Sequence, residues 1–397
     1  MPLPPTFVDS LQPMDARDVF AAFQEMPRKE RSTICINNEL RPADLFCYLG
    51  ARFGQPNGIQ NIFRSDDSDN LIHWDWMVRH DDGVVVFLGM NFRTEVHIVG
   101  LSPRDDYRSD LIEQLRSDFA KHGAEMGRIR KGLEHWTEFV NPYQRLRRSV
   151  ERLLANLDEL NLRPQEDRFD PFGSAVTPDD VAAPWNEVAR KYSRYSQGFG
   201  LCFGIRSMLP VMAEAFVNLL LYVLMKPEIR ADQRLTENVF RQAIDVRIKT
   251  LSINCVGFKR QPDYSAAACR AYHSLVNERN DLLHGNVVID KLKFNEVYFW
   301  GKVPVFKEYR SVWERSLQVE ADAVGLQAVR SELSTVDALS DYLLSCLDDT
   351  LREKIDFMIR RYELGFNEPS GKVGVLFPEW LVDMRPWPSE SNPPEAV

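Results

Sequence analysis

The first part of the chain contains short stretches in which apolar and polar residues alternate, a pattern typical of β-strands. Four such stretches are expected to form strands, at residues 33–36, 72–78, 84–90 and 92–99. The sequence Asp81-Asp82-Gly83 lies between the second and the third, and its residue types are typical of a β-hairpin turn. The pattern therefore predicts a small antiparallel sheet.

The last of these stretches shows the alternation most clearly. Its apolar side is formed by Phe92, Val96 and Ile98. Its polar side is formed by Arg93, Glu95 and His97. Because an antiparallel sheet commonly packs one face on the core and leaves the other in water, we expect one solvent-exposed face here.

Two helices are expected beside this sheet. Asp15 is a suitable N-cap for a helix that ends near Met26, and apolar residues recur at helical spacing over residues 106–122. Residues 1–124 are therefore predicted to form an α+β domain, for which sensing or regulation is the hypothesis. Trp74 and Trp76 alternate on one strand, which is typical of core packing, and a ligand pocket is the alternative.

Residues 125–194 are expected to form a helical connector that continues into a loop rich in proline and aspartate at residues 163–184. Three arginines of the connector, Arg145, Arg147 and Arg148, are candidates for RNA binding. A solvated helix is the alternative interpretation, and it is the commoner explanation of a run of charges.

The second half of the chain is predicted to be all-helical over residues 195–366. Helical spacing of apolar residues indicates helices at residues 207–225, 236–256, 264–284, 320–333 and 337–363. Residues 297–305 are expected to add a short strand or hairpin arm. Residues 367–397 contain repeated prolines, which is typical of a mobile tail. The predicted fold class is therefore α+β overall, with an N-terminal α+β domain and a C-terminal helical bundle.

The composition is that of a globular protein, with 44% hydrophobic residues among 397, a length that favours two domains. The six cysteines form no C-x-x-C pair and are expected to be buried free thiols in a reducing, cytoplasmic setting. The N-terminus does not resemble a secretory signal. The apolar stretch at residues 208–225 is expected to be a buried core helix and not a membrane span, because Pro210, Glu214 and Asn218 lie in its middle.

The most distinctive polar residues lie at the end of the helix expected at residues 264–284. They are Arg279, Asn280 and His284, and Gly285 follows them as a natural C-cap. Asn280 and His284 share a face because they are four residues apart. Arg279 and His284 are five residues apart, which places them about 140° apart around the helix. One chain therefore cannot direct both at one atom unless the helix end unwinds or a second subunit contributes, as in a symmetric dimer.

These residue types suit the cleavage of RNA without a metal ion. His284 can act as general base or acid near neutral pH, and the guanidinium of Arg279 can bind two oxygens of the phosphorane that forms. Asn280 would orient either Arg279 or His284. The ribose 2′-hydroxyl is the nucleophile, so the expected products carry 2′,3′-cyclic phosphate and 5′-hydroxyl ends. No cofactor is required. The formal charge of −9 does not indicate a broad nucleic-acid-binding face, so RNA would have to contact a local patch.

The motif Arg279-Asn280-Asp281-Leu282-Leu283-His284-Gly285 resembles the R-x4–6-H motif of HEPN domains. These are small helical bundles, and many are ribonucleases of bacterial defence and toxin–antitoxin systems. The segment at residues 214–218 also resembles the first helix of that family. The resemblance extends over about residues 195–365, under half of the chain. It implies a homodimer with a composite site at the interface. Glu214 and Asn218 are expected to be buried polar groups satisfied by their neighbours, and the functional alternative is that they support the motif, with Glu214 orienting Arg279.

Other hypotheses explain the same residues. Arg279 and His284 could be structural, since a histidine in the last turn favours the helix dipole and Arg279 could pair with Glu278, Asp281 or Glu214. A HEPN-like domain without catalysis would serve as a dimerisation or partner-binding module. A third hypothesis is an antitoxin-regulated toxin that is silenced by a modification near the motif. No metal site is expected at the remaining histidines, because none has a second ligand at a suitable spacing.

Overall fold

A computed structural model of the chain describes residues 3–26, 29–62, 71–81, 83–102, 104, 107–169, 182–285 and 293–377. The fold is α+β, with 56% helix, 15% strand and small antiparallel sheets, as the sequence predicts. The chain divides into two compact units, which are residues 1–136 with 375–397 and residues 137–374.

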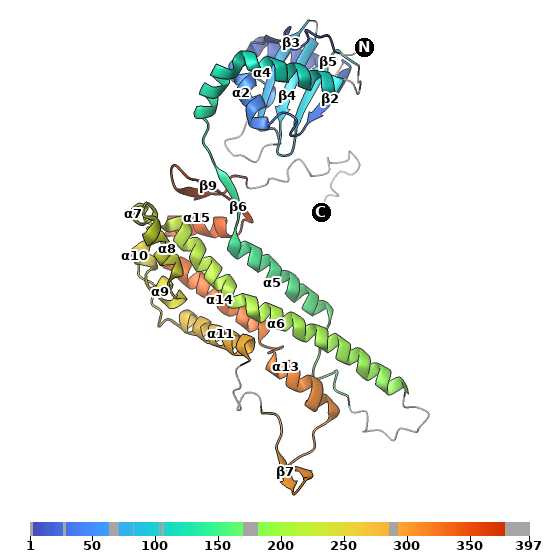
Figure 1. Cartoon of the computed structure of the whole chain (residues 1–397), viewed down its shortest axis with the longest axis vertical. Coiled ribbons are helices and arrows are strands. Elements are labelled where there is room, and N and C mark those ends of the chain that lie inside the picture. Colours follow the sequence, from blue (N-terminus) through green and yellow to red (C-terminus); the bar gives the residue numbers. More distant parts are fainter. Residues whose placement is uncertain are drawn as a thin grey trace, which may run out of the picture. The chain divides into compact units, whose positions relative to one another are not determined.

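The first unit is built on a five-stranded antiparallel sheet (Figure 1). In spatial order its strands are β1 (Gln12–Pro13), β3 (Trp74–His80), β4 (Gly83–Gly89), β5 (Thr94–Val99) and β2 (Arg31–Ile36). The four predicted strands are confirmed. So is the hairpin, because His80 pairs with Gly83 across the turn between β3 and β4. Asp82, in the turn itself, lies outside the described residues.

Helices cover both faces of this sheet. Trp76, Phe87 and Ile98 point into a core that is shared with α2 (Pro42–Phe53) and α4 (Tyr107–Lys131). On the opposite face, Met77 and Val86 pack with α1 (Ala16–Glu25) and α3 (Ile59–Ile62). The expectation of a solvent-exposed second face is therefore confirmed only in part. Short helices that the alternation does not reveal cover this face at Met77 and Val86, whereas Thr33 and Cys35 of β2 are exposed. Phe92 was expected on the apolar face, but it precedes β5 and is exposed.

The predicted helix cap at Asp15 is confirmed, because its carboxylate accepts the backbone N–H groups of Arg17 and Asp18. The helix expected to end at His122 instead continues to Lys131 as α4. Trp74 and Trp76 contact each other edge to face, with ring centroids 5.6 Å apart. Trp76 is fully buried, which agrees with core packing.

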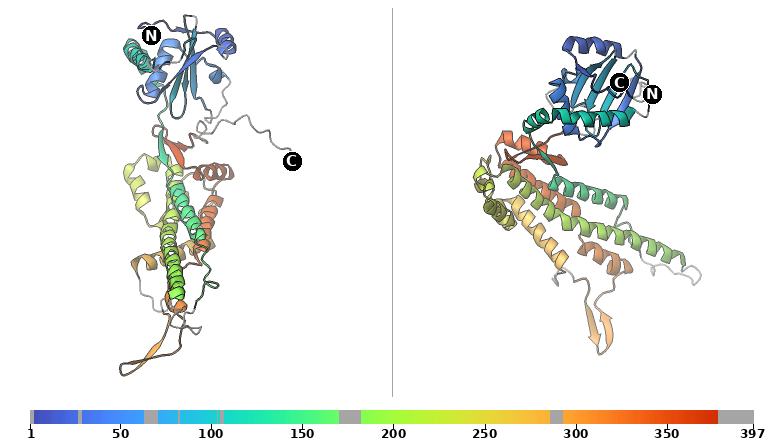
Figure 2. Two further views of the ribbon diagram at one scale, coloured as in Figure 1. Left: turned by 90° about the vertical axis from the view of Figure 1, so that its right-hand side faces the viewer. Right: turned by 45° about the horizontal axis from the view of Figure 1, so that its top comes forward.

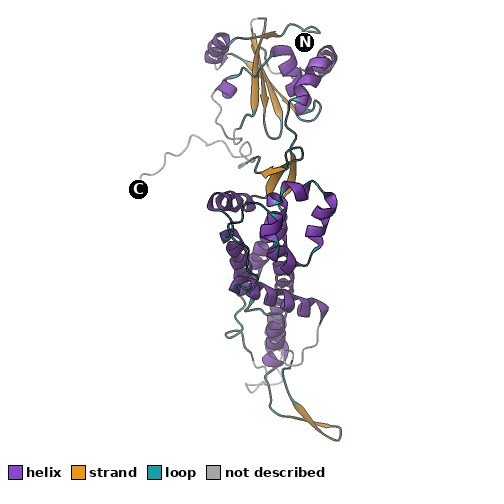
Figure 3. Ribbon diagram, turned by 90° about the vertical axis from the view of Figure 1, so that its left-hand side faces the viewer, coloured by secondary structure: helices purple, strands orange, loops and turns teal. Residues whose placement is uncertain are grey.

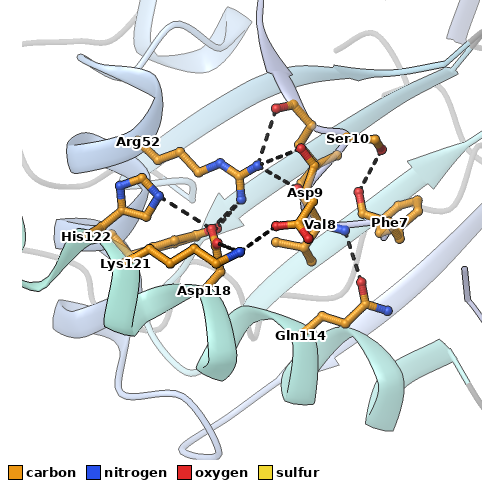
Figure 4. A network of polar contacts seen from close by, with 11 residues as sticks. Phe7, Val8, Asp9, Ser10, Arg52, Gln114, Asp118, Lys121 and His122 are labelled. Carbon is orange, nitrogen blue, oxygen red and sulfur yellow. Dashed lines mark hydrogen bonds and ion pairs between the residues drawn. The ribbon is translucent and has the colours of Figure 1, made fainter. Parts of the chain in front are cut away.

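A buried carboxylate fastens the N-terminal segment to this unit. Asp118 of α4 accepts hydrogen bonds from the Tyr48 hydroxyl at 2.7 Å and from Arg52 at 2.5 Å (Figure 4). Arg52 also donates to the carbonyl of Val8 at 2.6 Å. Lys121 bridges the Asp118 carboxylate to Asp9. One side chain of α4 thus organises contacts to α2 and to the chain that precedes β1.

The second unit is organised around α6 (Ala182–Leu224), a 43-residue helix. Three helices pack along it, as Figure 2 shows from two sides. They are α5 (Pro142–Glu159), α11 (Ala267–His284) and α14 (Val329–Ser345). A three-stranded antiparallel sheet lies in the same unit, in the order β10 (Lys372–Gly374), β9 (Glu363–Asn367) and β6 (Thr137–Val140).

This arrangement changes the expected division of the chain. The predicted connector at residues 125–194 is not a separate segment. Its first residues belong to α4 of the first unit. Its strand β6 pairs with β9, and its helix α5 packs along α6, so both belong to the second unit. Asn141, between β6 and α5, is fully buried and donates to the carbonyls of Ile359 and Arg361. Part of the expected tail also forms β10, and residues 378–397 lie outside the described residues.

Several expected helices are divided in the structure. Residues 236–256 fall in α8 (Gln233–Arg241), α9 (Ile244–Lys249) and α10 (Leu251–Asn254), because the backbone of Gln242 is extended and interrupts the helix. Residues 337–363 are divided between α14 and α15 (Asp349–Ile359). The remaining helical segments of this unit are α7 (Pro227–Arg230), η3 (Glu314–Gln318) and α13 (Val319–Ala323). The hairpin arm expected at residues 297–305 is confirmed as β7 (Val297–Trp300) paired with β8 (Val303–Phe306).

The apolarity of α6 is explained by its position in this unit. Among the described residues it is the one helix that is long and apolar enough to span a membrane, over Asn186–Leu224, with a mean hydropathy of 1.7 in its most apolar window. However, 61% of that window is buried inside the protein. Leu209, Phe216 and Leu220 on this helix are at most 1% exposed, as in the core helix of a bundle.

The cysteines agree with the sequence in all but one case. Five are buried free thiols, at positions 47, 202, 255, 269 and 346. Cys35 is exposed, because it lies on β2, where side chains at every second position point away from the core.

The Asp118 network gives a prediction for the stability of the first unit. The side chains of Asp118 and Arg52 are 5% and 11% exposed, and removing one partner of a buried ion pair is strongly destabilising. We expect Asp118→Asn to lower the free energy of unfolding by about 3 kcal/mol in urea titrations at pH 7. Asp9→Asn is the matched control, since Asp9 is 56% exposed, and it should change little.

The same network predicts a pH dependence. Burial would raise the pKa of Asp118, but hydrogen bonds from Tyr48 and Lys121 and the charge of Arg52 outweigh it and lower the pKa. A carboxyl whose pKa is lowered in the folded state stabilises the protein above its unfolded pKa of about 3.9, and this contribution is lost as the pH falls through the folded pKa. The difference between wild type and Asp118→Asn should therefore shrink below about pH 4. A difference that stays constant down to pH 2 would contradict this role.

Candidate functional site

The motif residues lie on the last two turns of α11, where the sequence places them. The helix ends at His284, and Gly285 follows with φ 60° and ψ 37°, a left-handed conformation in which its N–H bonds the carbonyl of Asp281. The predicted C-cap is therefore confirmed. Cys269, Tyr272 and Leu275 form the buried side of the helix.

Arg279 points toward this buried side. It follows Tyr272 by seven residues, which is nearly two full turns, so the two side chains share a face. Tyr272 is fully buried, and its hydroxyl lies 3.4 Å from the carbonyl of Pro210 on α6. The Nε of Arg279 is itself buried and has no hydrogen-bond partner among the residues that the structure describes. A buried guanidinium nitrogen without an acceptor is costly, so Arg279 could bind a further acceptor, although Nε of Arg194 and of Arg247 share this feature.

His284 lies on a different side of α11. It is exposed, whereas Asn280, one turn earlier on the same face, is half-buried. The helix remains regular to His284, so the arginine and the histidine of one chain stay about 140° apart. The structure thus brings the three motif residues to one helix end, but within one chain it does not direct Arg279 and His284 at a common point.

A buried ion-pair cluster fixes α11 beside the motif. Arg206 of α6 bonds both carboxylate oxygens of Glu332 on α14 at 2.8 Å, and it reaches Glu278 on α11 at 2.9 Å. The side chains of Arg206 and Glu332 are 10% and 9% exposed. Because Glu278 directly precedes Arg279, this cluster sets the rotation of the helix at the motif. The sequence alone did not reveal Arg206, since it lies 73 positions from the motif and belongs to no recognisable pattern.

Glu214 and Asn218 of α6 bind Arg247 and not Arg279, the expected partner of Glu214. Arg247 of α9 donates to Asn218 at 2.5 Å and to Glu214 at 3.2 Å. Arg247 is 7% exposed, so these two polar residues of α6 compensate its charge. Among the described residues, no hydrogen bond or ion pair joins Glu214 to Arg279, so the predicted orientation of Arg279 by Glu214 stays a prediction. Both charges lie near enough to Tyr272 to influence its pKa, which burial raises.

The three arginines proposed for RNA contact lie on α5 and have different surroundings. Arg147 bonds Asp337 at 2.5 Å and Glu151 at 2.9 Å. Arg148 lies over the ring of Tyr362, 4.3 Å from its centroid. Arg145 is exposed and has no ion-pair partner among the described residues. Arg145 is therefore the one most available to a phosphate, and the other two contribute first to packing.

A cavity of 910 Å³ lies at the other end of α11. Its lining includes Lys249, Tyr264, Arg270 and His273. The Tyr264 ring lies 4.9 Å from the Lys249 ammonium, and its hydroxyl is 3.4 Å from Nδ1 of His273. The cavity begins three turns before His284, so it does not contain the motif residues.

The histidines of the first unit are held by the sheet. His80 bonds Ser10 at 2.8 Å, and His97 bonds Thr33 at 2.9 Å and lies 3.3 Å from Glu95. Burial lowers the pKa of His97. In the parts of the chain that the structure describes, no three His, Cys, Asp or Glu side chains form a group that could hold a metal ion.

Comparison of the chain with protein-family models, with curated proteins and with solved structures returned no match. The motif and its surroundings are therefore judged on their own chemistry.

The Arg206 cluster gives a prediction for the helical unit. Glu332→Gln would leave the Arg206 guanidinium with only the half-exposed Glu278 as a charged partner. We expect the free energy of unfolding to fall by about 3 kcal/mol, with faster hydrogen exchange in α11 and α14. Glu353→Gln on the exposed side of α15 is the control and should leave both measurements unchanged. Unaltered exchange in α11 would show that the cluster does not hold this helix.

Proposed function

We propose that the chain is a metal-independent endoribonuclease of the HEPN type, of the kind used in bacterial defence or toxin systems. It cleaves RNA by attack of the ribose 2′-hydroxyl and leaves 2′,3′-cyclic phosphate and 5′-hydroxyl ends. The observation that carries the proposal is the end of α11, where a capped helix presents an exposed His284 and an Arg279 whose buried Nε has no partner among the described residues.

Each motif residue has a role in this chemistry. His284 is exposed to solvent, so it can take the proton of the 2′-hydroxyl or protonate the leaving 5′-oxygen. Arg279 stabilises the phosphorane with its guanidinium, which presents two parallel N–H donors to two oxygens. Asn280 lies on the face of His284 and orients either the imidazole or the substrate.

The proposed active form contains two chains. The separation of about 140° between Arg279 and His284 prevents one regular helix from supplying both groups to one phosphate. A two-fold axis beside the ends of two α11 helices would place the histidine of one chain near the arginine of the other. The N-terminal unit would then sense a trigger or restrain the enzyme.

The separation of about 140° between Arg279 and His284 also supports a second candidate function, a dimerisation or partner-binding module without catalysis. In that case Arg279 belongs to the buried side of α11 and His284 only terminates the helix favourably. Activity on bare RNA separates the two functions.

The first test is cleavage of a mixed RNA pool in the presence of a chelator. Wild type is expected to produce cyclic-phosphate ends, and His284→Ala should be at least about 100-fold slower because a general acid–base group is lost. His273→Ala is the matched control, since it removes another exposed histidine of α11 and should keep full activity. Equal cleavage by wild type and His284→Ala, or cleavage that the chelator abolishes, would refute the mechanism.

A second test asks whether the site is shared between chains. Arg279→Ala and His284→Ala should each be inactive alone. Mixed after unfolding and refolding together, they should regain about a quarter of wild-type activity, because half of the dimers are mixed and each mixed dimer has one intact site. No recovery from a mixture that does form mixed dimers would show that both groups act from one chain.

A further inference from the structure

The β7–β8 hairpin is the most apolar exposed feature of the described chain. Figure 3 shows it in orange, apart from the helices of its own unit. The exposed fractions are 57% for Tyr298, 68% for Phe299, 84% for Trp300 and 60% for Val303. Val297 and Val305 are also exposed. Aromatic side chains of this size are seldom left in water unless they serve an interface.

The apolar surface of this arm is large enough for a stable association. A fully buried aromatic side chain covers about 150–250 Å². At the observed exposures, the three aromatic residues and three valines of the hairpin offer roughly 600 Å². A standard interface buries about 800 Å² on each partner. The arm offers apolar area of the same order, but its side chains lie on both faces, so a contact along one edge would cover only the part next to that edge.

The apolar residues occupy both faces of the hairpin. In the observed register Trp300 pairs with Val303 and Tyr298 with Val305 on one face, while Phe299 pairs with Pro304 on the other. A flat partner surface could cover only one of these faces. An isolated two-stranded hairpin is also only marginally stable in water. The arm thus needs a partner that adds strands to it or encloses it.

The two edges of the hairpin differ in their ability to accept another strand. Pro304 removes one N–H from β8, which is a common way of protecting an edge. The β7 strand, Val297–Trp300, contains no proline and no charged residue. Its outer N–H and C=O groups are therefore free to pair with a further strand, without repulsion if that strand is identical.

The charges argue against lipid and against nucleic acid as the partner. Lys302 lies in the turn at the tip of the arm, the part that would have to enter a bilayer, and an open sheet edge is not tolerated in hydrocarbon. Phosphates would need several free cations, but Lys293 and Lys307 both bind Glu296, at 2.7 and 2.5 Å, and Arg310 binds Glu308. Lys302 is then the one cation of the described residues 293–310 without an ion pair. The arm therefore fits a protein partner that presents an uncharged, apolar strand.

We propose that this partner is a second copy of the chain, held by antiparallel pairing of β7 with β7 of the other copy. A two-fold axis between two identical edge strands makes them antiparallel, and the two hairpins become one four-stranded sheet whose aromatic side chains pack together. The assignment extends the proposed function, which requires two chains. The described part of the arm begins nine residues after His284, so the proposed contact and the motif are neighbours along the chain.

The test is the mass of the full chain by light scattering during gel filtration. Wild type is expected at twice the 45.9 kDa of one chain. In a shortened variant, residues 297–306 are replaced by Asn-Gly, which closes the hairpin where the N–H of Lys307 bonds the carbonyl of Glu296 at 3.1 Å. This variant should be monomeric and keep its helical circular dichroism.

Point variants keep the test independent of the deletion. Trp300→Lys should weaken the dimer at least about tenfold, as expected for the loss of a central aromatic residue from an interface. Ile253→Lys is the matched control, because Ile253 is a 58% exposed apolar residue of α10 in the same unit, and it should remain dimeric. A monomeric wild type, or a dimer that survives the shortened arm, would overturn the proposal. Wild type that is monomeric and binds anionic vesicles would assign the arm to a membrane surface.

Cleavage measured on the same samples separates the two proposals. A dimeric wild type without ribonuclease activity would leave the arm assigned and remove the proposed function. A monomeric wild type that cleaves RNA through His284 would remove both the arm assignment and the two-chain site, and would leave only the ribonuclease chemistry.

Discussion

Arg206 connects three helices of the second unit through a single guanidinium, because it binds Glu332 of α14 and Glu278 of α11 from its place on α6. A planar guanidinium with several N–H donors can satisfy two carboxylates at once, which an ammonium group does less well. The buried Glu332 must keep this partner or leave a buried charge uncompensated, whereas Glu278 is half-exposed. The cluster therefore limits both the position and the rotation of α11.

The rotation of α11 decides what its polar residues can do. With Tyr272 buried against α6 and Glu278 held by Arg206, Arg279 is directed toward the buried side and His284 toward solvent. If α11 turned to bring His284 inward, Tyr272 would lose its buried position. In the proposed mechanism, both groups can therefore act on one phosphate only if a second copy assembles or the end of α11 unwinds. A second copy recruited by the β7–β8 arm would satisfy this condition from outside the unit.

Polar groups in the cores of both units follow one rule, since each buried charge is met by partners from other elements. Asp118 has Tyr48 and Arg52, Arg247 has Glu214 and Asn218, and Arg206 has two glutamates. The exposed hairpin is the reverse case, because apolar side chains lie in water without a partner in the described chain. Arg279 and the hairpin are thus two places in the described part of the second unit where the local chemistry is incomplete within one chain.

The sequence by itself determined the elements whose information is local. The strands of the first sheet, the Asp81–Gly83 turn, the Asp15 cap and the Gly285 cap depend on residues within a few positions of one another, so alternation and cap residues predict them. The helices on the second face of the sheet, the division of residues 236–256 and the pairing of β6 with β9 could not be predicted in this way. They depend on contacts between segments far apart in the chain. For the candidate site, the sequence supplied Arg279, Asn280 and His284 and their angular separation. Only the tertiary structure decided which side of α11 is buried. It also decided that Glu214 binds Arg247 and that Arg206 holds α11. These contacts join helices that are far apart in sequence, and they follow from packing and from the compensation of buried charge.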